Sequence, residues 1–403
     1  MATLSERILR APAGTYVDRK VDRAFAHDGT GVLALESWKR MERGRPCRPD
    51  RIYLFFDHIV PANNSTTAGL QAELREFARS SGVCFSDTGE GICHQQMAEG
   101  IVLPGEIVAG ADSHTCTLGA FGAFATGVGA TEMAAIWATG ETWFRVPETI
   151  GVYLSGSLRG PSEAKDVALA LTGRLGADGA SYHSIEFVGQ GAAAMPMTGR
   201  LTLCNLAVET GAKTGLFYAD EETVRYLSGY SHKVSPQKPE SCRYFSEIEL
   251  ELDDIVPLVA IPPRVDRPKP VSELEGLPVD QVFVGTCTNG RYEDLALLAR
   301  VLGDKRVAVR TIVVPASRSV LLRAAKSGVL ATLIGAGCMV GPPGCGPCLG
   351  AHMGVIGEGE VCVSTANRNF TNRMGVGGRV YLTSVATAAT TALHGELTVP
   401  EEA

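Results

Sequence analysis

The stretch "VDQVFVGTCTNGRYEDLALLARVLGDKRVAVRTIVVPASRSVLLRAAKSGVLATLIGAG" (residues 279–337) decides the fold class. Short valine-rich runs alternate in it with apolar patterns of helical period. The pattern predicts a strand at 280–285, a helix from about 291, a strand at 307–314, a helix from about 317 and a strand near 329–334. Such alternation indicates α/β architecture with mostly parallel sheets.

The same alternation occurs earlier in the chain. "TIGVYLSG" (149–156) predicts a strand, a helical pattern follows, and "HSIEFVG" (183–189) predicts the next strand. The stretch 257–278 contains six prolines, which cannot continue a helix or a central strand and suit an extended connector. We therefore predict three α/β domains, at residues 1–148, 149–265 and 266–403.

Composition excludes several classes of protein. The 403 residues are 45% hydrophobic and carry a formal charge of −7, which indicates a globular protein and gives no basic footprint for nucleic acid. Eleven cysteines in so long a chain favour a reducing compartment over a disulfide framework. Thr3 and Glu6 have capping-box spacing and predict a helix of the mature protein. The uncharged stretch 115–131 is glycine-rich and predicts a buried segment, so we expect a cytoplasmic protein without a membrane partner.

The loop "GPPGCGPCLG" (341–350) places Cys345 and Cys348 three positions apart. Such a pair can be a redox dithiol, half of a zinc site or part of an iron–sulfur site, and the spacing alone leaves all three open. Glycines in the loop expose backbone N–H groups, which favours an iron–sulfur site. Cys287 follows a predicted strand and precedes a helix, where a thiolate is stabilised. Three thiolates would leave one iron of a cubane open to a substrate oxygen. Four other cysteines are interpreted as buried side chains that behave as small apolar residues: Cys84, Cys204, Cys338 and Cys362.

Histidines and acids follow predicted strands in the first third of the chain. "LFFDHIVPANN" contains Asp57 and His58, and "GEGICHQQ" contains His94. "VAGADSHTCT" contains Asp112, Ser113 and His114. A single histidine of this kind is more often structural, but three in loops of small polar residues favour a catalytic site.

Seven motifs in a fixed order carry a resemblance to a known family. They are "FDHIVPANN", "GEGICHQ", "GADSHT", "LCNLAVETGAKTG", "GTCTNGR", "GCGPCLG" and "STANRNFTNRMG". Together they resemble the aconitase superfamily, and within it the large subunits of 3-isopropylmalate dehydratase and homoaconitase. The resemblance covers about residues 8 to 398.

The resemblance implies the fold, the cofactor and the site. The fold would be three α/β domains of the aconitase type around a central iron–sulfur cluster, lacking the swivel domain. Cys287, Cys345 and Cys348 would bind a [4Fe–4S] cluster, one per subunit. His58, oriented by Asp57, would protonate the departing hydroxyl, and His94 would pair with Glu209. Further site residues would be Asp112 and His114 as catalytic groups, Ser113, Asn205, Asn367, Arg368 and Arg373 as substrate or cluster contacts, Asn289 as a polar group beside the cluster, and His27 as a substrate contact.

The implied reaction moves a hydroxyl between neighbouring carbons of a hydroxy-diacid. It needs a Lewis acid, a proton donor, a base and cations for the carboxylates. A separate small subunit with the swivel domain would supply the serine base. Ser317 and Arg318 match a different loop of the family and are not assigned to that role. The expected pair is 2-isopropylmalate and 3-isopropylmalate in leucine biosynthesis, with homoaconitate, 2,3-dimethylmalate and citrate chemistry as alternatives. A non-catalytic iron–sulfur or zinc module, and a dinucleotide-binding oxidoreductase based on "GAGCMVG" (335–341), fit the sequence less well.

Overall fold

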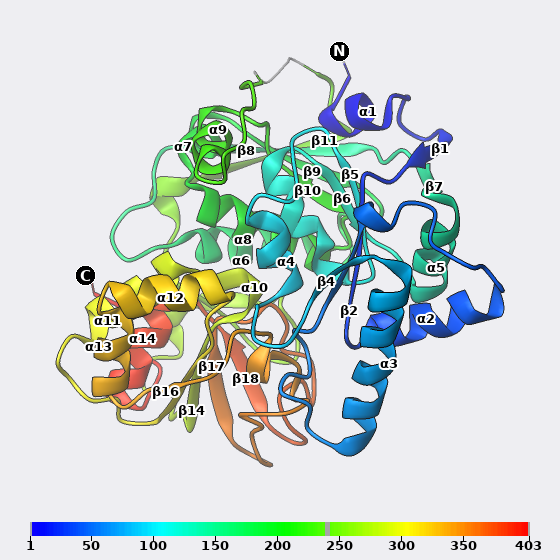
Figure 1. The fold of residues 1–403 in the computed structure, drawn as a ribbon. Helices are drawn as coiled ribbons and strands as arrows, with labels where there is room; N and C mark the ends of the chain where they lie inside the picture. Colours follow the sequence, from blue (N-terminus) through cyan, green and yellow to red (C-terminus); the bar gives the residue numbers. More distant parts are fainter. Residues whose placement is uncertain (1, 238–241, 402–403) are drawn as a thin grey trace.

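The computed structural model describes residues 2–237 and 242–401. The chain forms three larger sheets, each in its own stretch of the chain, and a two-stranded sheet. Figure 1 shows the helices packed around them. The sheets are almost entirely parallel, which confirms the predicted α/β class. The domain boundaries after residues 148 and 265 remain a prediction.

The first sheet has the strand order β4-β3-β2-β5-β6, and all of its pairs are parallel. Its strands are β2 (Arg23–His27), β3 (Ile52–Phe55), β4 (Cys84–Ser86), β5 (Ile107–Gly110) and β6 (Phe124–Gly127). The helices of this part are α1 (Leu4–Leu9), α2 (Thr30–Arg40), η1 (Pro49–Arg51), α3 (Ser65–Ser81), α4 (Cys93–Ala98), η2 (Ser113–Phe121) and α5 (Ala130–Thr139). An antiparallel ribbon of β1 (Tyr16–Lys20) and β7 (Glu141–Arg145) lies beside them. The predicted capping box of Thr3 and Glu6 is present at the start of α1.

The second sheet has the strand order β10-β9-β8-β11, again with parallel pairs. Its strands are β8 (Thr149–Ser155), β9 (Ser184–Val188), β10 (Thr214–Leu216) and β11 (Ser246–Glu251). Its helices are α6 (Ala164–Leu175), α7 (Gln190–Ala194), α8 (Met197–Ala207), η3 (Val208–Thr210), α9 (Glu221–Ser228) and η4 (Leu252–Asp254). The strand, helix, strand unit predicted from "TIGVYLSG" to "HSIEFVG" is therefore confirmed.

The third sheet has the strand order β13-β12-β18-β17-β14-β15-β16. Its strands are β12 (Leu258–Ala260), β13 (Pro268–Pro270), β14 (Gln281–Val284), β15 (Arg310–Val313), β16 (Met339–Val340), β17 (Val361–Ser364) and β18 (Arg379–Leu382). Its helices are η5 (Val271–Glu273), α10 (Thr286–Asn289), α11 (Tyr292–Leu302), α12 (Arg318–Lys326), α13 (Val329–Gly335), η6 (Gly346–Leu349) and α14 (Val385–His394).

Two sequence predictions for this third part are wrong. The apolar run at 329–334 forms helix α13, preceded by Gly328 in the left-handed region, and the parallel strand comes later as β16. The proline-rich stretch 257–278 is not only a connector, because β12 and β13 pair antiparallel at one margin of the sheet. The prolines of β13 are tolerated because that strand lies at the edge and pairs on one side.

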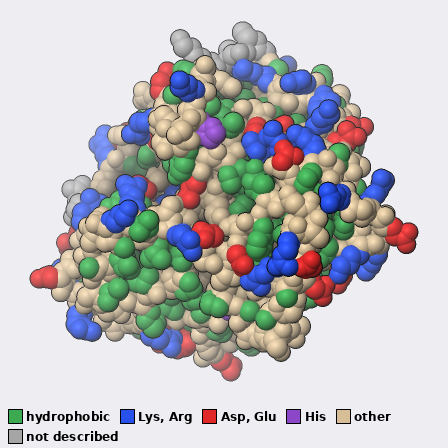
Figure 2. Space-filling model, in the orientation of Figure 1, with side chains coloured by type: hydrophobic (Ala, Val, Ile, Leu, Met, Phe, Trp, Pro, Cys, Tyr) green, Lys and Arg blue, Asp and Glu red, His purple; other side chains and the backbone are tan. Residues whose placement is uncertain are grey.

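The hydrophobic segments of the chain lie inside the fold or on its surface, and no helix that the structure describes has the character of a membrane span. Among the described residues, none of the helices is both long and apolar enough to cross a membrane. In the glycine-rich stretch 115–131, which was predicted to be buried, residues 115–126 are buried, whereas Gly129 and Thr131 are exposed. On the face shown in Figure 2, basic and acidic side chains are interspersed, and hydrophobic ones gather over α12 and α13, where Leu322 and Ile334 are exposed.

Candidate active site

The predicted site residues follow the carboxyl ends of parallel strands in the first and third sheets. In the first sheet, His27 ends β2, Asp57 and His58 follow β3, and Asp112 follows β5. In the third sheet, Cys287 follows β14, Asn367 and Arg368 follow β17, and the loop of Cys345 and Cys348 follows β16. In open α/β sheets, ligands bind in the crevice outside these carboxyl ends.

Three buried thiols lie on the third-sheet side. Cys287, Cys345 and Cys348 are free and 5%, 6% and 2% exposed. Two amides contact Cys287: Asn205 Nδ2 donates to its Sγ over 3.1 Å, and Asn367 Nδ2 donates to the same sulfur over 3.4 Å. Asn367 Oδ1 lies 3.7 Å from Cys348 Sγ. The donor set is therefore one of thiols held by neutral amides.

The geometry of these sulfurs does not fit a single metal ion. A tetrahedral zinc ion with Zn–S bonds of about 2.3 Å holds its sulfurs within about 4 Å of one another. In the described part of the chain, the group of at least three ligand atoms within 4.8 Å of one another consists of His27, Asp28, Asp57 and His58, without the cysteines. Arg373 Nη2 lies 3.7 Å from Cys348 Sγ, and its buried Nε finds no partner among the described atoms. The three thiols and this cation fit a larger anionic group such as an iron–sulfur cluster.

The His27 and Asp57 group is a hydrogen-bonded network. Asp28 accepts from the backbone N–H groups of His58 (2.9 Å) and Ile59 (2.8 Å) and from Gln71 Nε2 (3.2 Å). Asp57 accepts from His58 Nδ1 (2.7 Å) and from the N–H of Cys93 (2.6 Å). Because the carboxylate oxygens are already occupied, this group is not an open cation site.

The charge of His58 is set by Asp57. Burial alone lowers the pKa of His58, but the charge and hydrogen bond of Asp57 offset it and raise the pKa to about 9. Burial alone raises the pKa of Asp57, and the charge and hydrogen bond of His58 lower it to about 2. At neutral pH, His58 is therefore an imidazolium, and its Nε2 faces Asp112 Oδ2 at 3.9 Å.

The carboxylate of Asp112 lies within 4 Å of four histidine rings: His27, His58, His94 and His114. Its Oδ1 is 2.9 Å from His94 Nε2, and its Oδ2 is 3.6 Å from His27 Nε2. The ring of His27 stacks on that of His58 with centroids 3.6 Å apart. Although burial favours neutral forms, the pKa of Asp112 is well below its ordinary value because of the charge of His94, and the pKa of His94 is well above its ordinary value because of the charges of Cys93 and Asp112.

Glu209 joins a different histidine from the one predicted. It accepts from His114 Nε2 over 3.1 Å and from Arg368 Nε over 2.7 Å. The predicted pair of His94 and Glu209 is wrong, since His94 faces Asp112. Ser113 Oγ is 3.4 Å from His114 Nδ1. Asn289, predicted beside the cysteines, donates to Asp294 Oδ1 over 3.0 Å at the start of α11.

Sequence reasoning missed three buried charged residues of this site. They are Asp28 (5% exposed), Lys165 (0%) and Arg291 (3%). Arg291 donates to the carbonyls of Cys287 and Thr288, and Lys165 donates to those of Thr365 and Ala366. Asp28 follows a strand end directly, which was a usable signal, and Arg291 ends the quoted "GTCTNGR". Lys165 begins a helix, where a lysine usually signals a solvated face.

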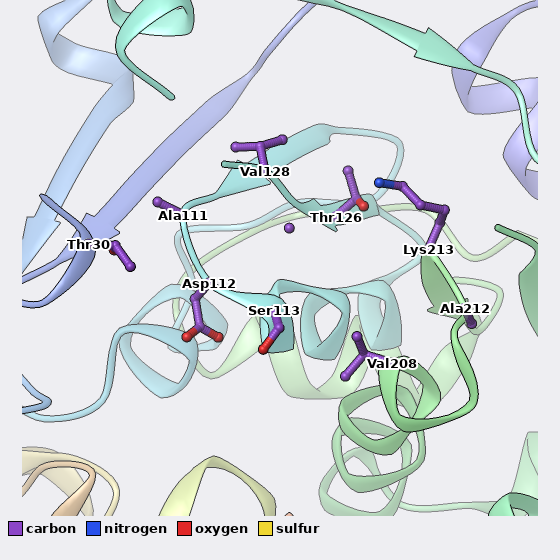
Figure 3. A pocket seen from close by; sticks show the side chains of 10 residues that line it. Thr30, Ala111, Asp112, Ser113, Thr126, Val128, Val208, Ala212 and Lys213 are labelled. Carbon is purple, nitrogen blue, oxygen red and sulfur yellow. The ribbon is translucent and has the colours of Figure 1, made fainter. Parts of the chain in front are cut away.

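A cavity of about 510 Å³ adjoins the site. Asp112 and Ser113 contribute to its lining, together with Val208, Ala212 and Lys213 from the second-sheet part. Figure 3 shows the Lys213 nitrogen directed toward Thr126, another lining residue. Among the described residues, no carboxylate forms a salt bridge with Lys213. Burial lowers the pKa of Lys213.

Comparisons with known proteins agree over nearly the whole chain. The family model described as "Aconitase family (aconitate hydratase)" matches residues 4–275 and 265–395. The chain is 54% identical to the "Probable methanogen homoaconitase large subunit" of Methanosarcina mazei, over 95% of this chain and 99% of that protein. It is 48% identical to the "3-isopropylmalate dehydratase large subunit 1" of Methanopyrus kandleri, over 99% and 98%. The fold resembles that of Thermococcus kodakaraensis aconitase X in its holo-form, with a TM-score of 0.51, 12% identity and coverage of 87% and 84%.

Proposed function

The chain belongs to the aconitase family, and on that premise we propose that it is the large subunit of a hydro-lyase that isomerises a substituted malate. The reaction removes a hydroxyl from one carbon and returns it at the neighbouring carbon. The substrate pair we propose is 2-isopropylmalate and 3-isopropylmalate, and the relative from Methanopyrus kandleri is named a 3-isopropylmalate dehydratase large subunit. The observation that carries the proposal is that the hydrogen-bonded pair of Asp57 and His58 adjoins the buried thiols, because the N–H of Cys345 donates to the Asp57 carbonyl over 2.7 Å.

The proposed cofactor is one [4Fe–4S] cluster held by Cys287, Cys345 and Cys348. When bound, it would supply a Lewis acid for the substrate oxygen, because three protein thiolates leave one iron open. The amides of Asn205 and Asn367 support the proposal, since hydrogen bonds to sulfur stabilise such clusters. The eleven cysteines, all free thiols, are consistent with the reducing cytoplasm that we propose as its location.

The chain's own groups have distinct parts in the proposal. His58 holds a proton on Nε2 for the departing hydroxide, and Asp57 keeps that proton in place at neutral pH. Arg368 and Arg373 offer planar cations for substrate carboxylates. Glu209 fixes the orientation of Arg368 through their 2.7 Å contact.

The base is proposed to come from a partner. The relatives are named large subunits, which supports a small subunit that completes the site. We propose that this subunit carries the swivel domain and the serine base. Ser317 stays unassigned, because its Oγ contacts Glu99 over 2.5 Å and caps α12.

A second candidate substrate class is favoured by Lys213. A homocitrate-type substrate carries a further carboxylate on its side arm, and the cation of Lys213 in the adjoining cavity could bind that group. The 54% identical relative from Methanosarcina mazei is named a homoaconitase large subunit.

The test is reconstitution with iron and sulfide, followed by assay with the small subunit. We expect brown protein with an electron paramagnetic resonance signal of an open-iron cluster, and turnover of isopropylmalate above homocitrate and citrate. Cys345→Ser should abolish cluster and activity, whereas Cys84→Ser, at a half-buried thiol outside the site, should keep activity within a few-fold. Colourless protein with stoichiometric zinc, or full activity of the large subunit alone, would contradict the proposal.

A further inference from the structure

We propose that Lys165 is a positioning residue that ties the segment of Cys287 to the segment of Asn367 and adds a buried positive charge near the bound cluster. This inference rests on the proposed function, because it assumes the iron–sulfur group. Lys165 lies in the first turn of α6, which belongs to the second-sheet part. Its side chain is 0% exposed, although neither the sequence motifs nor the proposed reaction assign it any part.

The ammonium of Lys165 is anchored on the segment that follows β17. Nζ donates to the carbonyl of Thr365 over 2.8 Å and to that of Ala366 over 2.7 Å. The next residue is Asn367, whose amide contacts Cys287 Sγ and Cys348 Sγ. Two backbone carbonyls thus fix the position from which Asn367 reaches both sulfurs.

The Thr365 carbonyl that binds Lys165 also fixes the segment of Cys287. The hydroxyl of Thr288 donates to the Thr365 carbonyl over 2.8 Å, beside the Lys165 bond. Thr365 Oγ1 accepts from the N–H of Gly285 over 3.0 Å and lies 3.2 Å from its carbonyl. Lys165 therefore connects the residues on both sides of Cys287 to the segment of Asn367.

The charge of Lys165 has no carboxylate partner at salt-bridge distance in the described part of the chain. Its acidic neighbours offer only partial charge, because burial raises the pKa of Asp166 to about 7 and that of Glu163 to about 8. Burial lowers the pKa of Lys165 itself to about 8, and the charge of Cys287 is the largest influence that opposes burial. An uncompensated buried ammonium is costly. The thiolates of Cys287 and Cys348, together with Asp166 when it is ionised, are the anionic groups that act on this ammonium.

This arrangement has two consequences for a bound cluster. A fixed positive charge stabilises the reduced, more negative form, because cluster potentials follow the local charge and hydrogen bonding. A fixed Asn367 keeps the hydrogen bond from its Nδ2 to Cys287 Sγ in place, and such outer groups typically change metal affinity about 10–100-fold.

The test compares Lys165→Met, which removes charge and hydrogen bonds, with Lys165→Gln, which keeps amide donors for the carbonyls. Each is reconstituted with iron and sulfide beside the wild type and the control Lys269→Gln, an exposed lysine paired with Glu273. The reduction potential is measured by redox titration followed by electron paramagnetic resonance, and cluster loss is timed after addition of a chelator. Unfolding temperatures of the cluster-free proteins report on folding.

We expect both Lys165 variants to have a more negative potential than the control. Cluster loss should be about tenfold faster in Lys165→Met and intermediate in Lys165→Gln. Unchanged potentials in a brown, active Lys165→Gln protein would overturn this inference and leave the proposed function intact. Wild-type protein that takes up no cluster would overturn both.

Discussion

At the scale of single residues, the imidazolium of His58 needs a physical cause, because a buried histidine ordinarily loses its proton. The cause is Asp57, which is itself held anionic by His58 and by the N–H of Cys93. The pair stays charged between about pH 2 and about pH 9. The pKa of His58 is raised on folding, so its contribution to stability is complete below about pH 6.5 and is lost as the pH rises through about 9.

Asp57→Asn tests this assignment through the pH profile. Without the carboxylate, burial prevails and the pKa of His58 falls. We expect the alkaline limb of kcat/KM, near pH 9 in the wild type, to move at least one unit lower, and activity at pH 7 to fall about 100-fold, the scale of general acid catalysis. The matched control is Asp18→Asn, an exposed aspartate of β1. An unchanged alkaline limb in Asp57→Asn would assign that limb to another group.

Single residues also show how far sequence can predict a site. Cys287, His58 and His114 were predictable because each follows a predicted strand in a loop of small polar residues. Arg368 and Arg373 came only from the resemblance of their motif to the family. Which acid pairs with which histidine was not predictable. The contacts of Asp112 with His94 and of Glu209 with His114 depend on how the helices that carry these residues pack. Lys165 was not predicted as a site residue because a lysine in the first turn of a helix normally faces water. Its burial comes from the packing of α6 on the segment after β17.

At the scale of elements, η2 carries Ser113 and His114 into the site and packs against β10 without space to spare. A Cβ added at Gly119 would lie 1.8 Å from the carbonyl oxygen of Gly215. That oxygen belongs to β10, which pairs with β9, so it cannot move alone. The position of His114 therefore depends on the absence of a side chain five residues further along η2.

Gly119→Ala should destabilise the fold by about 1–3 kcal/mol through overpacking. It should also lower activity, because η2 must shift away from β10. The control is Gly69→Ala in α3, where a Cβ meets nothing within 4 Å. A helix gains about 0.5–1 kcal/mol from that exchange. Chemical unfolding of both variants measures the difference, and equal stability of the two would contradict the close packing of η2 on β10.

Helices and strands were predictable where the hydrophobic period of a segment agreed with the glycine or polar residues at its ends. The alternation at 149–189 and the first four elements of 280–326 were predicted because valine-rich runs and helical patterns are separated by glycine or polar residues. The run at 329–334 was ambiguous, since a short apolar segment fits a strand or a buried helix turn. Gly328 and the later β16 decided for the helix. The strands β12 and β13 were hidden by their prolines, which an edge position tolerates.

At the scale of the whole molecule, the site forms where three separate stretches of chain meet. The first sheet supplies His58 and Asp112, the third supplies the thiols, and the second-sheet part supplies Asn205, Glu209 and Lys165. One hydrophobic core runs continuously beneath the first two sheets, from Phe25 to Phe187, and includes Cys287 of the third. A substrate cavity next to this site is therefore lined by more than one of these stretches. The cavity of Ser113 and Lys213 is an example, because it has walls from the first-sheet and second-sheet parts.

Lys213 gives a prediction about substrate choice by the assembled enzyme. If its cation binds a carboxylate arm, Lys213→Met should lower kcat/KM for homocitrate at least tenfold, about 1.4 kcal/mol of binding, and leave kcat/KM for isopropylmalate within twofold. The control Lys326→Met removes an exposed lysine from the last turn of α12. Both substrates are assayed with the small subunit present. An equal loss on both would make Lys213 a structural residue, and no loss on either would exclude the cavity as the place of the arm. Because an apolar isopropyl group gains nothing from an ammonium, only unequal losses fit a carboxylate subsite.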